Sequence, residues 1–184
     1  VSVIYYIILN KKVIPIINRI ALKRKIQLNK IYFKTSNKLD NATSIKIVQK
    51  TLFSILNTTM NVSDICLLIK NNNCFYGKSE INKNIINIED KEITNSKEFS
   101  NVININNIKS LNNDYRFINK LHGISILVKI KFNIRIVALL GVYKKLNNKK
   151  YSYEEIQFFI KLANKISLIL NKIRKENFNQ VKNN

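Results

Sequence analysis

The segment from Tyr151 to Ile173 constrains the fold most, because it specifies a long helix that cannot stand alone. It opens with a Ser-x-x-Glu capping box, in which the side chains of Ser152 and Glu155 each accept a hydrogen bond from the other residue's backbone N–H. Apolar residues then recur at three- and four-residue steps, which is the period of an amphipathic helix. They form two stripes about a third of a turn apart, and a helix with two apolar stripes must bury both.

The first stripe has a heptad-like spacing, which is typical of helices that pair along a seam. We therefore expect a homodimer with this stripe between the subunits. The alternative is that the chain's own first helix covers the second stripe, which gives a monomer. The candidate seam residues are Ile156, Phe159, Ala163, Ile166, Leu170 and Ile173, and the second stripe contains Phe158, Leu162 and Ile169.

Helical periodicity and continuous apolar runs predict the other elements. Pro15 favours the start of the first helix, and Asn133 suits a tight turn between two strands because asparagine tolerates positive φ. Residues 78–101 are polar and weakly periodic, and we expect an irregular segment with at most a short helix there. The expected helices cover 15–38 and 44–59, and the expected strands cover 64–70, 74–77, 101–105, 123–132 and 134–143.

The length of 184 residues and the hydrophobic content of 46% predict one domain with a real core. We expect that domain to span residues 15–177. Residues 1–14 are expected to form an N-terminal tail or strand, and residues 178–184 a disordered tail.

The end of the chain resembles the closing signature of GAF domains. That signature is an aromatic residue, a Ser or Thr cap and acidic residues, followed by a helix of the form leucine–alanine–x–x–isoleucine. Upstream, the run from Val137 to Tyr143 with Gly141 resembles the family's penultimate core strand. The opening also fits, with residues 28–39, a break, a helix over 45–56 and a strand over 65–69, so the likeness covers about residues 20–175. A PAS-type or roadblock-type sandwich is the structural alternative. The matching residues are Tyr151, Ser152, Glu154, Glu155, Phe159, Leu162, Ala163 and Ile166.

The resemblance implies an α+β fold, a GAF/PAS-like antiparallel sheet with the N- and C-terminal helices packed on one face. Family members bind cyclic nucleotides, bilins, haem or small metabolites on the other face. The implied function is a non-enzymatic regulatory, small-ligand-binding or dimerisation module, such as the remnant of a histidine kinase or another sensor. The implied partners are a second copy, joined in a parallel helical bundle, and a separate effector protein.

Residue types that carry chemistry are scarce. Three glycines cannot build a Gly-rich phosphate loop, and one histidine with two cysteines cannot form a four-ligand zinc site. Cys66 lies in a core strand and Cys74 beside a turn, and neither precedes a histidine, as a covalent bilin site of this family needs. His122 fits a loop or the end of a strand.

We therefore expect no catalytic residues, no metal and no cofactor, and the sequence does not identify the residues that would hold a ligand. Glu89, Asp90 and Glu92 are close enough along the chain to act as paired carboxylates, but their surroundings indicate a solvated loop. An enzyme that works through Cys66 or Cys74 is the least favoured interpretation.

The net charge of +21 suggests nucleic-acid binding. However, 27 lysines stand against five arginines, whereas proteins that read nucleic acids use arginine heavily. The lysines are also spread along the chain, which favours a solvated surface with weak, non-specific, salt-sensitive binding to polyanions. A basic nucleic-acid-associated protein remains the alternative function.

Isoleucine, asparagine and lysine, with 33, 30 and 27 residues, have A/T-rich codons, which indicates a biased genome. We expect an organelle-encoded protein of the plastid stroma, with a bacterial cytoplasm as the alternative. The apolar run Val1–Leu9 is shorter than the roughly 20 residues that a membrane-spanning helix needs, so no membrane span is expected.

Overall fold

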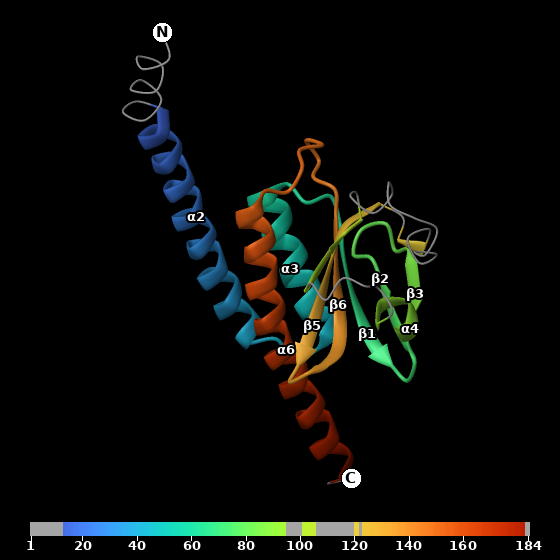
Figure 1. The fold of residues 1–184 in the computed structure, drawn as a ribbon. Coiled ribbons are helices and arrows are strands. Elements are labelled where there is room, and N and C mark those ends of the chain that lie inside the picture. The colour runs from blue at the N-terminus through green and yellow to red at the C-terminus, as the bar shows by residue number, and fades with distance from the viewer. Residues whose placement is uncertain (1–12, 95–100, 106–119, 122, 183–184) are drawn as a thin grey trace.

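The protein is described by a computed structural model that covers residues 13–94, 101–105, 120–121 and 123–182 (Figure 1). Six antiparallel strands form one sheet in the order β3-β2-β1-β6-β5-β4. Helices α2, α3 and α6 lie on one side of this sheet, and α4 lies on the other side (Figure 1). The fold is thus the expected α+β arrangement. The strands are β1 (Ile65–Asn71), β2 (Cys74–Lys78), β3 (Ile85–Glu89), β4 (Val102–Asn104), β5 (Ile124–Phe132) and β6 (Arg135–Tyr143), and the helices are α2 (Ile14–Asp40), α3 (Ile45–Met60), α4 (Asp90–Thr94) and α6 (Tyr153–Lys182).

The central strands β1, β5 and β6 have apolar side chains on both faces, because both faces of the sheet are covered. In β6, Leu140 and Val142 join the core under the helices, whereas Leu139 and Tyr143 join a second cluster on the opposite face. Side chains alternate between the faces of a strand, so a strand covered on both sides reads as a continuous apolar run. This double burial explains the runs in the sequence.

The helix ends follow local sequence signals. Pro15 lies in the first turn of α2, where its missing N–H costs nothing. The Ser44 hydroxyl accepts a hydrogen bond from the Ile47 N–H at 3.3 Å and caps α3, which ends at Asn61 in the left-handed conformation. Asn133, at φ 54°, makes the predicted turn between β5 and β6.

The structure differs from the sequence analysis in three places. Residues 78–101 were expected to be irregular, but they contain strand β3, in which Ile86 and Ile88 are buried. The end of the chain was expected to be disordered from residue 178, but α6 continues to Lys182. Ile14, assigned to the N-terminal tail, is already helical. Residues 1–12, 183 and 184 of the expected tails lie outside the described residues.

Candidate functional site

Helices α2 and α6 run parallel and are joined by ion pairs at both ends of their contact (Figure 1). Near the start of α6, Arg24 of α2 pairs with Glu155 at 2.8 Å. Further along both helices, Asp40 of α2 pairs with Lys165 of α6 at 2.6 Å. The two chain-terminal helices are therefore held in a fixed register on the same side of the sheet.

Glu155 is the centre of a buried charged cluster at the start of α6. Its oxygens lie 2.7 and 2.8 Å from the Lys145 ammonium, and both side chains are less than 10% exposed. The capping box predicted from the sequence is present: Glu155 accepts from the Ser152 N–H at 2.8 Å, and its own N–H donates to the Ser152 hydroxyl at 3.4 Å. The Tyr151 ring lies 4.9 Å from the Lys145 ammonium. Every charge of the cluster thus has a partner.

Burial alone would raise the pKa of Glu155, because it removes water from the carboxylate. Hydrogen bonds from Lys145 and the Ser152 N–H, together with the charge of Lys145 and the bond from Arg24, outweigh burial and hold the pKa below its usual value of 4.5. Glu155 is therefore ionised at neutral pH and works as a structural connector between α6, the β6–α6 loop and α2.

The candidate dimer seam lies inside the single chain, which corrects that assignment. Five of the six residues are at most 3% exposed, and Ile156 is half-buried against the same core. The second stripe is also buried, because the sheet, α2 and α3 together cover both stripes of α6. A second copy cannot reach this seam in the folded chain, and the homodimer itself stays a prediction. The five buried seam residues are Phe159, Ala163, Ile166, Leu170 and Ile173.

The opposite face of the sheet, where the resemblance places ligands, carries an apolar cluster among the described residues. Cys66 and Tyr143 lie in it, with Phe75, Ile88 and Leu127 around them. Cys66 pairs across the strands with Gly141, where an added Cβ would lie 2.4 Å from the thiol sulfur. A glycine is required at that position because the thiol fills the space that a side chain would take.

The residues considered for catalysis do not come together. Burial raises the pKa of the Cys66 thiol to about 12, so it is not a thiolate at neutral pH. Cys74 is half-buried at the start of β2. His122 lies outside the described residues. Within the part of the chain that the structure describes, no three potential metal ligands cluster.

The carboxylates around α4 form ion pairs with lysines and do not form a carboxylate–carboxylate pair. Asp90 pairs with Lys70, and Glu92 lies 3.1 Å from Lys120. Glu89 pairs with Lys91 at 2.8 Å, and this contact lowers the pKa of Glu89. These carboxylates form exposed or half-exposed ion pairs, which differs from a carboxylate pair for acid–base chemistry.

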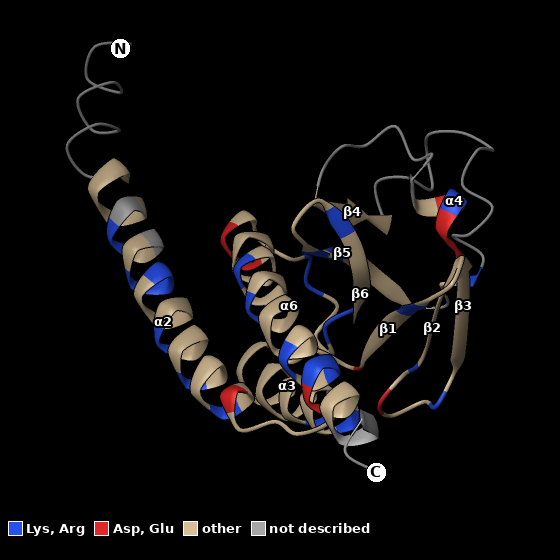
Figure 2. Ribbon diagram, turned by 90° about the horizontal axis from the view of Figure 1, so that it is seen from below, with Lys and Arg blue, Asp and Glu red and all other residues tan. Residues whose placement is uncertain are grey.

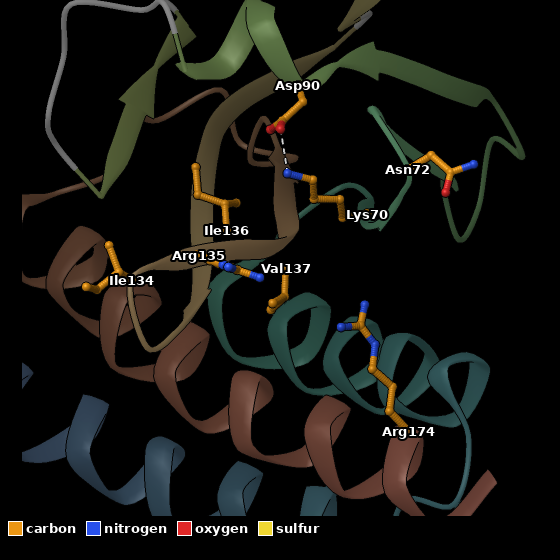
Figure 3. Close-up of a pocket in the computed structure, with 8 residues that line it drawn as sticks. All are labelled: Lys70, Asn72, Asp90, Ile134, Arg135, Ile136, Val137 and Arg174. Atoms are coloured by element: carbon orange, nitrogen blue, oxygen red, sulfur yellow. Dashed lines mark hydrogen bonds and ion pairs between the residues drawn. The ribbon is translucent and has the colours of Figure 1, made fainter. Parts of the chain in front are cut away.

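An open cavity of about 530 Å³ lies where the central strand β1 ends and β6 begins, next to the C-terminal part of α6 (Figure 3). Lys70 is turned toward Asp90 on one side of it (Figure 3). Arg174 extends from α6 toward the strands, and Arg135 lies beside Val137 on β6 (Figure 3). Sequence analysis missed this site, since Arg135 and Arg174 are far apart in the chain. The lining residues are Lys70, Asn72, Asp90, Ile134, Arg135, Ile136, Val137 and Arg174.

Comparison with solved structures identifies the architecture. The GAF domain of a phosphoenolpyruvate-protein phosphotransferase from Coxiella burnetii superposes with a TM-score of 0.65 at 14% identity, over 83% of this chain and 98% of that one. The GAF domain of the Acinetobacter phosphoenolpyruvate-protein phosphotransferase gives a TM-score of 0.63 at 13% identity, over 82% and 95%. The chain has a GAF fold. No family model and no curated protein matches the sequence.

Two further solved structures are similar to this chain. The nlh2 GAF domain of A. aeolicus in an inactive state has a TM-score of 0.55 at 15% identity, over 80% of this chain and 97% of that one. Residues 122 to 287 of a methyl-accepting chemotaxis protein have a TM-score of 0.58 at 14% identity, over 76% and 96%. At these identities the likeness concerns the fold, and it transfers no ligand-binding residue to this chain.

Proposed function

We propose that this chain is a non-enzymatic regulatory module that passes a change in the GAF domain along α2 and α6. The supporting observation is the parallel packing of these two helices on one side of the sheet. Figure 1 shows that α2 projects beyond the sheet at one end of the molecule and α6 at the other. A packed helix that continues past its domain is a rigid element able to carry a displacement to a neighbour.

The similar structures support the same proposal. They include GAF domains of phosphoenolpyruvate-protein phosphotransferases and part of a methyl-accepting chemotaxis protein. A separate effector protein, contacted by the projecting ends, fits a module of this type. The origin of the chain as a remnant of a sensor such as a histidine kinase, and its place in a plastid, stay predictions from the sequence.

We propose further that the module is a homodimer that pairs through α2. The N-terminal part of α2 projects away from the rest of the domain (Figure 1), and apolar side chains are exposed over much of the length of this helix. Leu22, Ile26 and Phe33 share one face of the helix and are 58%, 48% and 65% exposed. Contiguous exposed apolar surface of this kind marks an interaction site. Ile16, Ile17 and Ile20 add apolar surface where α2 projects, at 59%, 57% and 62% exposure.

Light scattering after gel filtration tests the dimer. We expect a dimer at tens of micromolar and a monomer for Ile26→Glu, because a carboxylate in an apolar contact loses its hydration without a partner. Ile47→Glu is the matched control, since Ile47 is a comparably exposed isoleucine on α3, at 44%. A monomeric wild type, or equal dissociation by both variants, contradicts pairing through α2.

Nucleic-acid association is the less supported alternative. Lys and Arg lie along α2, on several strands and near the end of α6 rather than on one surface (Figure 2). A scattered charge of +21 gives polyanion binding that is non-specific and falls with salt. Among the described helices, none is both long and apolar enough to span a membrane.

A further inference from the structure

The cavity beside α6 holds arginines that the composition does not explain. The chain contains 27 lysines and only five arginines, so its ordinary surface cation is lysine. Two of the five arginines, Arg135 and Arg174, nevertheless line this one cavity. Arginine differs from lysine in presenting a planar fork of N–H donors that matches the oxygens of phosphate and carboxylate groups.

These two guanidinium groups also lack a partner within the part of the chain that the structure describes. The third cation of the cavity, Lys70, pairs with Asp90 at 2.5 Å and lies 5.6 Å from the Phe75 ring. Among the described residues, neither Arg135 nor Arg174 forms an ion pair or a hydrogen bond. The lining residues therefore carry two positive charges in excess, and a ligand with two negative charges balances them.

The uncharged part of the lining indicates that the ligand also has an organic part. Ile134, at the turn between β5 and β6, is 94% exposed, and Val137 adds apolar surface on the face of β6 that is turned toward the helices, whereas Ile136 lies on the opposite face. Asn72, on the other side of Lys70 from Ile136, adds a side-chain amide to the lining (Figure 3). The volume of about 530 Å³ lies within the usual range of about 300–1,000 Å³ for small-molecule sites.

We propose that this cavity binds a freely diffusing anion of the phosphate class with at least two negative charges, a phosphate monoester or a diphosphate, between Arg135 and Arg174. The organic part of the ligand lies on Ile134 and Val137, on the side of the sheet where α6 packs. A single carboxylate would neutralise only half of the excess charge, which is why a phosphate is the better match.

The ligand would also act on α6. Arg135 belongs to the sheet and Arg174 to α6, so an anion held by both ties the C-terminal part of α6 to the sheet. This second part of the inference rests on the proposed function, in which α6 carries a change out of the domain. The binding site itself does not depend on it.

Calorimetric titration with inorganic pyrophosphate at about 150 mM salt tests the site. We expect one saturable site per chain, and a loss of affinity of about 10- to 100-fold in Arg135→Gln and in Arg174→Gln, the range for a charge-assisted hydrogen bond. Arg174→Lys keeps the charge but loses the planar fork, and it is expected to restore only part of the affinity.

Lys175→Gln is the matched control, because it removes one charge from the adjacent, exposed position of the same helix. We expect it to change the affinity by less than about twofold, the screened effect of a remote surface charge. Equal losses in Lys175→Gln and Arg174→Gln would overturn the site in favour of diffuse charge. Absence of saturable pyrophosphate binding would also overturn the site. Tighter binding of a single-stranded oligonucleotide than of pyrophosphate, with the same dependence on Arg135 and Arg174, would overturn the proposal of a small diffusing ligand.

Hydrogen exchange separates the two parts of the inference. Pyrophosphate is expected to slow exchange of the backbone amides in residues 174–182 of the wild type, and not in Arg135→Gln. Saturable binding without this protection overturns the link to α6 and leaves the anion site standing. Failure of the dimer test on α2 bears on the proposed function alone, because no α2 residue lines the cavity.

Discussion

Charged side chains gather at both ends of α6, and the two groups are arranged in opposite ways. At the N-terminal end, Glu155 is buried between Lys145, Arg24 and the Ser152 N–H. At the C-terminal end, Arg174 lines an open cavity with Arg135, and neither has an ion partner among the described residues. Burial explains the difference, since a buried charge without a partner is very costly, whereas an open one keeps its water.

The comparison separates charges that hold the fold from charges that are free to bind. Removing one of the two buried members of the cluster, Lys145 or Glu155, must damage the protein, because the other charge stays buried. Removing a cavity arginine must leave the fold almost unchanged and alter only what the cavity can hold. Three measurements of the free energy of unfolding test this contrast.

The largest effect is expected for Lys145→Ala, which leaves the buried Glu155 carboxylate with the exposed Arg24 as its only described ion partner, besides the hydrogen bond from the Ser152 N–H. The expected loss is about 3–5 kcal/mol in a denaturant titration, the range for breaking a buried ion pair. The double variant Lys145→Met with Glu155→Gln removes both charges and keeps a capping acceptor, so it is expected to recover most of that loss. A single variant that costs less than about 1 kcal/mol would show that the cluster is open to water.

Acid is expected to have an intermediate effect. The folded pKa of Glu155 is held below its ordinary value of 4.5, so its ionisation stabilises the fold above that pH. The stabilisation is lost as the pH falls through the lower, folded pKa. Glu155→Gln has no such group, and its free energy of unfolding should fall less between pH 6 and pH 3. Parallel pH curves for the two proteins would contradict this.

The smallest effects concern exposed arginines. Arg24 is 46% exposed in its pair with Glu155, and Arg24→Gln is expected to cost about 0.2–1 kcal/mol. Arg174→Gln should change the free energy of unfolding by less than about 0.5 kcal/mol, because no described partner is lost. A loss above about 1 kcal/mol for Arg174→Gln would mean that this cavity, too, holds the fold together.

The two ends of α6 also differ in how visible they are in the sequence. The capping box of Ser152 and Glu155 is a local pattern, and it predicted the start of the helix correctly. The burial of Lys145 could not be predicted from the local sequence, because it depends on how the β6–α6 loop packs against the start of α6. Arg135 and Arg174 are 39 positions apart and line the same cavity only because α6 packs on the sheet. The one available signal was the rarity of arginine.

The same distinction explains the fold. Central strands were predictable because burial on both faces produces long apolar runs. Strand β3 was missed because only Ile86 and Ile88 alternate inward, in a segment where isoleucine and asparagine are common everywhere. The placement of the first stripe of α6 between subunits was wrong, because a heptad-like spacing shows that a stripe is buried but does not show which element covers it. In this chain, the sheet and the other helices supply the cover.

The pairing of β1 with β6 has a consequence for how the chain is made. The paired residues of these two central strands are 69 to 77 positions apart in the sequence. At a synthesis rate of roughly 5–20 residues per second, β1 leaves the ribosome about 3.5–15 s before its partner strand does. During that interval its apolar edge is open, while β2 and β3 already pair beside it. The nascent chain is therefore expected to expose apolar strand surface until residue 143 has emerged, and the final helix is the last element available to cover the core.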